Sequence, residues 1–167
     1  MDTSKQQNSI RGVSEPPDGI VRFTVYGEPV SKLRARTVRQ QTKSGKTFTH
    51  SYTPEKTEIQ EFNVVMVYKS IYRGFGFDAD VPLRVVVTFF LQIPKSTSKI
   101  RKQRMLSGLV RPTKRPDVEN VAKLIMDALN TVAYHDDSQI VELEVRKFYS
   151  DQPRTEIFIA RIGDENE

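Results

Sequence analysis

Four stretches of the chain alternate apolar and polar residues with a period of two, the pattern of half-buried β-strands. They cover residues 20–26, 83–93, 139–149 and 155–162. The second is rich in β-branched and aromatic residues and is followed by Pro94, so we expect it to be the central strand. The turn sequence Ser150-Asp151-Gln152-Pro153 predicts that the last two strands form a hairpin.

Two other segments have the helical period. Thr53-Pro54-Glu55 is typical of a helix start with a hydroxyl N-cap, and apolar residues then recur to about Arg73, namely Ile59, Phe62, Val65, Met66 and Tyr72. A second helix is predicted from Pro116-Asp117 to about Ala133, with its buried stripe at Val118, Val121, Ala122, Ile125, Ala128, Leu129 and Val132. Residues 95–116 could add a helical turn or two. The order of elements predicts an α+β fold, a single-domain mixed β-sheet with helices packed on it.

The chain length favours one domain, which we place at residues 20–163. Residues 1–19 are polar and aperiodic and predict a disordered or loosely packed tail, and residues 164–167 form a short C-terminal tail. The segment from Val30 to Tyr52 contains the turn Ser44-Gly45-Lys46 and predicts either an extended ribbon or a mobile loop. The sequence lacks an apolar run long enough for a membrane span, so we expect a soluble, cytoplasmic protein.

Charge is distributed unevenly along the chain, whose net charge is +5. Two long stretches, residues 29–54 and 81–116, contain basic residues and no acid, and an acidic stretch follows. One basic run is commonly just a solvated surface, but two such runs favour binding to phosphates. The predicted DNA-binding residues are Lys32, Arg34, Arg36, Arg39, Lys43, Lys46, Lys99, Arg101, Lys102, Lys114 and Arg115.

The candidate chemistry lies on and after the second helix. Glu119, Lys123 and Asp127 are spaced by four residues and share one polar stripe, with Asp117 at the helix start. Taken alone, this pattern is more often an N-cap and a solvated ladder of charges. Asp136 and Asp137 follow at the entrance to a strand, and we expect these acids to meet those of the helix start at one end of the layer. Because the chain has no cysteine, a metal would be held by oxygen ligands, which Mg²⁺ prefers.

The same residues resemble a known family. Arg115-Pro116-Asp117-Val118-Glu119-Asn120-Val121-Ala122-Lys123-Leu124-Ile125-Met126-Asp127-Ala128-Leu129, followed by Asp136-Asp137-Ser138-Gln139-Ile140, closely resembles the signature of the RusA family of Holliday junction resolvases. Further likeness lies in Gly27-Glu28-Pro29-Val30-Ser31-Lys32, in Arg34 and Arg36, and in Tyr52-Thr53-Pro54 with Lys56-Thr57. The resemblance covers most of the chain from Ile20 onward.

The resemblance implies a homodimeric enzyme that depends on Mg²⁺, with Mn²⁺ as a substitute, and that nicks two opposed strands of a four-way junction in recombination and repair. Such enzymes are usually encoded by phages or prophages. By position, Asp117, Glu119 and Asp137 match the family's metal-binding and catalytic acids, and Lys123 matches its catalytic lysine. Asp136 is a weaker candidate as an additional metal ligand, and Asp127 could be purely structural.

This chain has Glu119 where the family usually has aspartate, and the longer side chain can alter metal coordination. Two alternatives therefore stay open: a junction-binding protein without catalysis, and a nuclease acting on other branched DNA. A further hypothesis concerns Phe75 and Phe77, which lie in a glycine-bracketed loop and could wedge into the junction centre, although an aromatic residue in such a loop is more often buried in the core.

Overall fold

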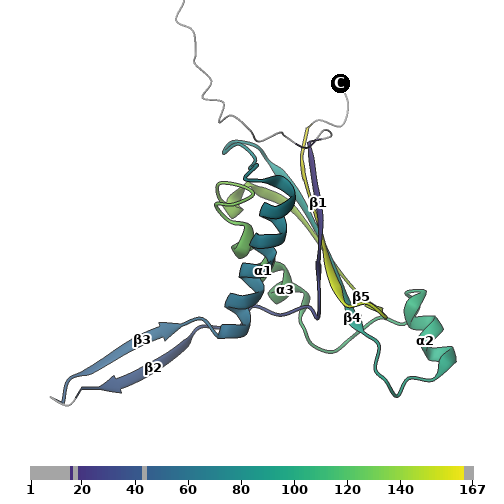
Figure 1. Ribbon diagram of the computed structural model, residues 1–167, viewed down its shortest axis with the longest axis horizontal. Helices are drawn as coiled ribbons and strands as arrows, with labels where there is room; N and C mark the ends of the chain where they lie inside the picture. The colour runs from purple at the N-terminus through teal and green to yellow at the C-terminus, as the bar shows by residue number, and fades with distance from the viewer. Residues whose placement is uncertain (1–15, 17–18, 43–44, 164–167) are drawn as a thin grey trace, which may run out of the picture.

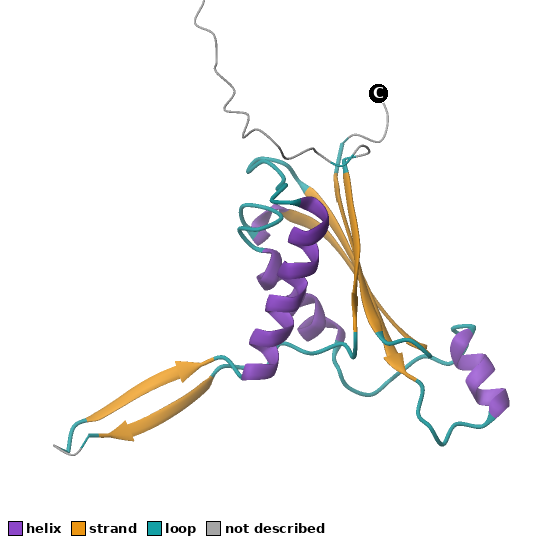
Figure 2. Cartoon of the chain, viewed as in Figure 1, coloured by secondary structure: helices purple, strands orange, loops and turns teal. Residues whose placement is uncertain are grey.

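The structure is a computed structural model in which residues 16, 19–42 and 45–163 are described. Both predicted tails therefore lie almost wholly outside the described residues, as does Lys43. The helices and strands, shown in Figures 1 and 2, are β1 (Ile20–Tyr26), β2 (Arg36–Gln41), β3 (Thr47–Tyr52), α1 (Glu55–Tyr72), β4 (Leu83–Gln92), α2 (Lys99–Leu106), α3 (Val118–Leu129), the short 3₁₀ helix η1 (Asp137–Gln139), β5 (Ile140–Ser150) and β6 (Arg154–Arg161).

The main sheet has four strands in the order β1-β6-β4-β5. β4 is parallel to β5 and antiparallel to β6, and β6 is antiparallel to β1. The predicted α+β fold with a mixed sheet is confirmed, and β4 is the interior strand that its apolar sequence predicted. Its side chains at Leu83, Val85, Val87, Phe89 and Leu91 are buried on one face.

The predicted hairpin between the last two strands is wrong. β5 and β6 are joined by a short connection, but β4 lies between them in the sheet. β4 ends at Gln92, opposite the last residue of β5, so the connection can cross over its end. Pairing two strands with the most apolar strand of the chain buries more surface than a local hairpin would, and tertiary packing overrides the turn signal.

Helices α1 and α3 pack against one face of the sheet, as Figure 1 shows. Both helices form close to where they were predicted, but α1 begins one residue later, with Pro54 rather than Thr53 at its N-cap and no capping hydrogen bond from a side chain. The buried face of α1 also differs from the predicted one. Val64 and Tyr68 are fully buried, whereas Ile59, Phe62 and Met66 are 52%, 62% and 49% exposed. Apolar residues lie on both sides of α1, so its periodicity did not identify the inner side.

The loop after α1 is packed into the body of the protein. Phe75 and Phe77 are 7% and 2% exposed, and their rings contact each other edge to face with centroids 5.2 Å apart. The Tyr68 hydroxyl donates to the Phe75 carbonyl at 2.6 Å, and the Phe77 amide donates to the Ala133 carbonyl at 2.8 Å. Both rings are core residues, so the hypothesis that they wedge into DNA is wrong.

Residues 36–41 and 47–52 form a two-stranded antiparallel ribbon, and the ribbon alternative for this segment is confirmed. We call the segment from residue 36 to residue 52 the arm. Figure 1 shows the arm extending away from the main sheet beside the start of α1. Helix α2, predicted only as a turn or two, projects on the other side at the same end of the molecule. Among the described residues, no helix combines the length and the apolar character that a membrane span requires.

Candidate functional site

The start of α3 presents acids that the fold does not use. Asp117 stands at the N-cap position with an extended backbone, but its side chain makes no capping hydrogen bond. Glu119, two residues later, is exposed, and neither acid forms an ion pair within the described part of the chain. The interpretation of Asp117 as a simple helix cap therefore lacks the interaction that would support it.

The polar stripe of α3 lies open because the opposite stripe is buried. Val121, Leu124, Ile125 and Leu129 are at most 2% exposed, and this fixes the rotation of the helix. Glu119 and Lys123 then line a shallow pocket of about 420 Å³ whose other wall is the segment from Lys32 to Ala35. The Lys32 amide donates to the Asn120 carbonyl at 2.8 Å, which holds this segment beside α3. One carboxylate thus shares the pocket with basic side chains from two elements.

Lys32 bridges the two helices. Its ammonium nitrogen lies 2.7 Å from a carboxylate oxygen of Asp127 on α3 and 2.5 Å from one of Glu61 on α1. Burial alone would lower the pKa of Lys32, but the hydrogen bonds and charges of Asp127 and Glu61 outweigh it, and the pKa is raised. Because two acids compensate its charge, we revise the prediction that Lys32 binds DNA and propose that Lys32 and Asp127 hold α1 and α3 together.

The loop that leads into α3 is tied to β5. The Lys147 ammonium donates to the carbonyls of Lys114 and Pro116 at 2.9 and 3.1 Å. Arg111 stacks over the Phe148 ring, 3.5 Å from its centroid, and donates to the Lys147 carbonyl. These contacts place the Asp117 end of α3 beside the last part of β5.

Of the two acids after α3, Asp136 has a structural partner, whereas Asp137 is exposed and makes no side-chain hydrogen bond or ion pair with the residues that the structure describes. Asp136 caps η1 and accepts a hydrogen bond from the Ser138 amide at 2.9 Å. Hydrogen bonds from the side chain and the backbone of Ser138 lower the pKa of Asp136. The Gln139 side chain is buried, accepts from the amides of His135 and Asp136, and donates to the carbonyls of Asp78 and Val81. This end of the layer is therefore a network that joins the 74–82 loop to the start of β5.

The expectation that Asp117 and Asp137 meet at one end of the layer is wrong within a single chain. β4 and β5 are parallel, so the connecting helix α3 must run back from the end of β4 to the start of β5. Asp117 precedes this helix and Asp137 follows it, and 12 helical residues span about 18 Å. Consistently, the described residues contain no group of three His, Asp or Glu side chains that could hold a metal.

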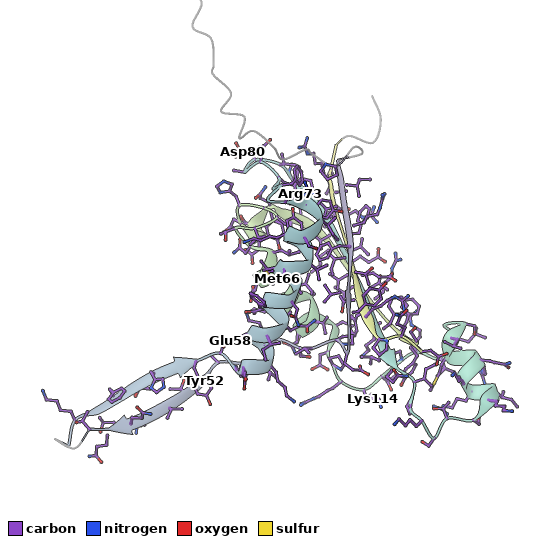
Figure 3. The ribbon with its side chains drawn as sticks, in the orientation of Figure 1. Tyr52, Glu58, Met66, Arg73, Asp80 and Lys114 are labelled. Carbon is purple, nitrogen blue, oxygen red and sulfur yellow. The ribbon has the colours of Figure 1, made fainter. Side chains whose placement is uncertain are left out.

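The basic residues predicted to bind DNA gather at the Asp117 end. Figure 3 shows Lys114 at that end of the molecule, with Tyr52 of the arm on one side and α2 on the other, whereas Asp80 lies at the opposite end. The following predicted side chains are exposed there: Arg34, Arg39, Lys46, Lys99, Arg101, Lys114 and Arg115. Lys102 is half-buried and pairs with Asp151 at 2.8 Å. Arg36 lies in β2, and its side chain is not described.

Sequence reasoning missed three residues that join the elements around the candidate acids. Glu61, Lys147 and Gln139 act through contacts with residues 29 to 61 positions away in the chain. Glu61 and Lys147 carry no local signal, because each looks like an ordinary surface charge. Gln139 did carry a signal, since glutamine three residues after a capping residue such as Asp136 is typical of a capping box, in which its side chain accepts from backbone amides.

Comparison with known proteins agrees with this architecture. The family described as endodeoxyribonuclease RusA matches residues 26–160. The chain is 38% identical over 150 residues to the uncharacterised protein YqaN of Bacillus subtilis strain 168, covering 86% of this chain and 97% of that protein. It is 37% identical over 87 residues to the crossover junction endodeoxyribonuclease rusA of Lactococcus phage r1t, covering 52% of this chain and 60% of that protein. The chain therefore belongs to the RusA family of endodeoxyribonucleases.

Proposed function

We propose that this protein is a divalent-metal-dependent endonuclease that resolves four-way DNA junctions by paired nicking, in the cytoplasm, during recombination and repair. The observation that carries the proposal is that Asp117 and Glu119 stand at the start of α3 without a capping hydrogen bond or ion pair among the described residues. Lys123 lines the same pocket as Glu119, at the end of the molecule where the arm and α2 project. Acids with no structural partner, beside a surface suited to phosphates, are what a phosphodiesterase needs.

The donor set fits Mg²⁺. Asp117 and Glu119 offer oxygen ligands, and Mg²⁺ in nucleic-acid enzymes is commonly held by one or two carboxylates together with waters and substrate phosphates. When bound, the metal would polarise the phosphoryl oxygen and lower the pKa of the attacking water. The extra methylene of Glu119 favours the larger, geometrically tolerant Mn²⁺ over Mg²⁺ relative to an aspartate at this position.

The side chains of the pocket supply the rest of the chemistry. Lys123 and Arg34 face the same pocket as Glu119 and would hold the phosphate and stabilise the negative charge that develops on its oxygens. Among the described residues, no side chain caps the backbone amides at the start of α3, and the helix dipole gives this end a partial positive charge that favours an anion. Together they favour a bound phosphate at the point where the carboxylates stand.

We also propose that the protein works as a homodimer, because a four-way junction has approximate two-fold symmetry and a symmetric dimer presents two equal sites to it. The exposed stripe of α1, formed by Ile59, Phe62 and Met66, offers an apolar face for a second copy. Asp137 and Asp136 would reach an Asp117 site only from that second copy. Phe62→Asp should then yield monomers in light scattering, and an unchanged dimer would place the interface elsewhere.

The function is tested by incubating a labelled synthetic four-way junction and a matched linear duplex with the protein, with Mg²⁺, with Mn²⁺ and with EDTA. Symmetric paired nicks that require metal and occur only in the junction would establish the proposal. Junction binding without nicks in either metal would favour a non-catalytic binding protein. Nicking of flaps or replication forks in preference to the junction would instead favour a nuclease for other branched DNA.

A shared site would appear when inactive variants are mixed. If Asp117 and Asp137 of different chains form one site, then Asp117→Asn and Asp137→Asn, each inactive alone, should recover part of the activity together, because some mixed dimers contain one intact pair. Sites contained in one chain would give no recovery. In that case the Asp117 end would act with its own two carboxylates.

A further inference from the structure

The arm has two chemically different faces. Residues directly opposite each other in an antiparallel pair lie on the same face, and Phe48 and His50 of β3 lie opposite Gln40 and Val38 of β2, with Tyr52 two residues further along the same face. The other face is rich in hydroxyl groups, from Thr37, Thr47, Thr49 and Ser51, and the Thr37 and Ser51 hydroxyls are 2.9 Å apart. One face of this ribbon therefore carries a row of aromatic rings.

The three rings follow one another along β3. The centroids of Phe48 and His50 are 6.1 Å apart in a stacked arrangement, and those of His50 and Tyr52 are 6.4 Å apart. Each step is close to two base steps of a nucleic-acid strand, at about 3.4 Å each. Phe48 and Tyr52 are 47% and 43% exposed, and every side chain of β3 is exposed. We call Phe48, His50 and Tyr52 the aromatic row.

Among the residues that the structure describes, the ring contacts of the aromatic row are those along the row itself. The arm projects from the body, and a lone two-stranded ribbon in water is at best marginally stable, so exposed aromatic rings on it need an external partner. The charge of the arm selects that partner. Residues 36–52 contain four basic residues and no acid in the sequence, and Arg39 and Lys46 are exposed. This composition fits a polyanion that also offers flat aromatic surfaces.

We propose that the aromatic row stacks on unpaired nucleobases of the DNA substrate, while the basic side chains of the arm follow its backbone. Every base has a flat face, so stacking needs no particular sequence and favours DNA whose bases are unpaired or splayed apart. This inference rests on the proposed function for the identity of the substrate. It assigns to the arm the contact with opened bases that the buried Phe75 and Phe77 cannot make.

The sequence makes a direct test simple, because the chain contains no tryptophan. In Phe48→Trp the single indole reports on the aromatic row, and stacking on a base quenches its fluorescence. The variant is titrated, in EDTA, with a four-way junction, with a single-stranded oligonucleotide and with heparin, a polyanion without bases. We expect quenching by both DNAs and none by heparin at equal saturation. Equal quenching by heparin, or none by DNA that is bound, would overturn the proposal.

Binding variants provide the second measurement. Phe48→Leu and Tyr52→Leu remove the rings and keep apolar bulk, and each should weaken junction binding by about 10-fold, the order of a lost base stack. Thr47→Val and Thr49→Val, on the opposite face of the arm, are the matched controls and should bind as the wild type does. Leucine variants that bind normally would refute stacking. Leucine variants that instead dissociate a dimer would assign the aromatic row to contacts between copies.

The outcomes separate this inference from the proposed function. A protein that nicks junctions normally while the tryptophan reporter stays silent would keep the function and lose the stacking role. A wild type that neither binds nor nicks junctions would remove the function itself.

Discussion

The two ends of α3 carry acids from one short stretch of sequence, but the fold uses them differently. At the start, Asp117 and Glu119 are exposed and no capping hydrogen bond engages Asp117. At the far end, Asp136 caps η1 and Gln139 joins two loops. An acid that the fold already uses is a weaker candidate for chemistry than one without a structural partner, and the comparison therefore favours Asp117 and Glu119 over Asp136.

The largest expected effect tests this comparison directly. Asp117→Asn keeps the size of the side chain and removes its charge, so it should slow junction nicking by about 100-fold or more, as the loss of one key electrostatic group commonly does. Junction binding should persist, because the basic residues are untouched. Single-turnover nicking and a gel-shift titration measure both. Asp137→Asn is the matched variant from the other end of α3. Full activity in Asp117→Asn would contradict the assignment of the reaction to the Asp117 end.

A smaller effect should appear in stability at the far end. Gln139→Leu keeps the side-chain volume but leaves two backbone amides and two carbonyls without their buried partner, which should cost about 2–3 kcal/mol of the free energy of unfolding. Urea unfolding followed by circular dichroism measures the loss. Nicking per folded molecule should change little, and a large loss of activity at full stability would show that this end takes part in the reaction.

The bridge between α1 and α3 predicts a pH dependence. The pKa of Lys32 is raised above its ordinary value of 10.5, so its stabilising contribution is complete below that value and is lost as the pH rises through the raised pKa. Lys32→Met should therefore cost about 1 kcal/mol at neutral pH, typical of a partly exposed ion pair, and less under strongly alkaline conditions. The urea unfolding midpoints of the wild type and of Lys32→Met, measured from neutral to strongly alkaline pH, test this. A difference that stayed constant over the range would contradict the bridge.

The smallest effect concerns Asp136, whose pKa is lowered by hydrogen bonds from Ser138. A lowered pKa means that the contribution of Asp136 to stability is present above the ordinary aspartate pKa and is lost as the pH falls through the lowered one. Asp136→Asn should thus be slightly less stable than the wild type at neutral pH. The two unfolding midpoints should converge in acid, and a difference that grew in acid would show that the carboxylate does not act as a cap.

Local sequence predicted the elements of this fold better than their neighbours in space. The period of two located β1 and β4, and the apolar stripe of α3 predicted its inner face except at Val118, which is 41% exposed at the helix start. The orientation of α1 failed because both sides are apolar, and the β5–β6 hairpin failed because a turn sequence does not exclude a third strand between its arms.

For the candidate site, too, local sequence predicted some features and not others. The spacing of Glu119 and Lys123 placed them on one open stripe, because helical spacing is local geometry. The separation of Asp117 from Asp137 was not predicted from the sequence, since it follows from the parallel pairing of β4 with β5. A direction of pairing is a property of the whole sheet, and no motif within 20 residues encodes it.

The strand order also constrains when the protein can complete its fold on the ribosome. The N-terminal strand β1 pairs, within the described residues, only with the C-terminal strand β6. Synthesis proceeds from the N-terminus, so β1 emerges first and must wait for almost the entire chain before its backbone hydrogen bonds with β6 can form. A chain that ends before β6 would therefore leave β1 without its partner in the sheet and β4 paired on one side only, and we expect proteases to degrade such a product.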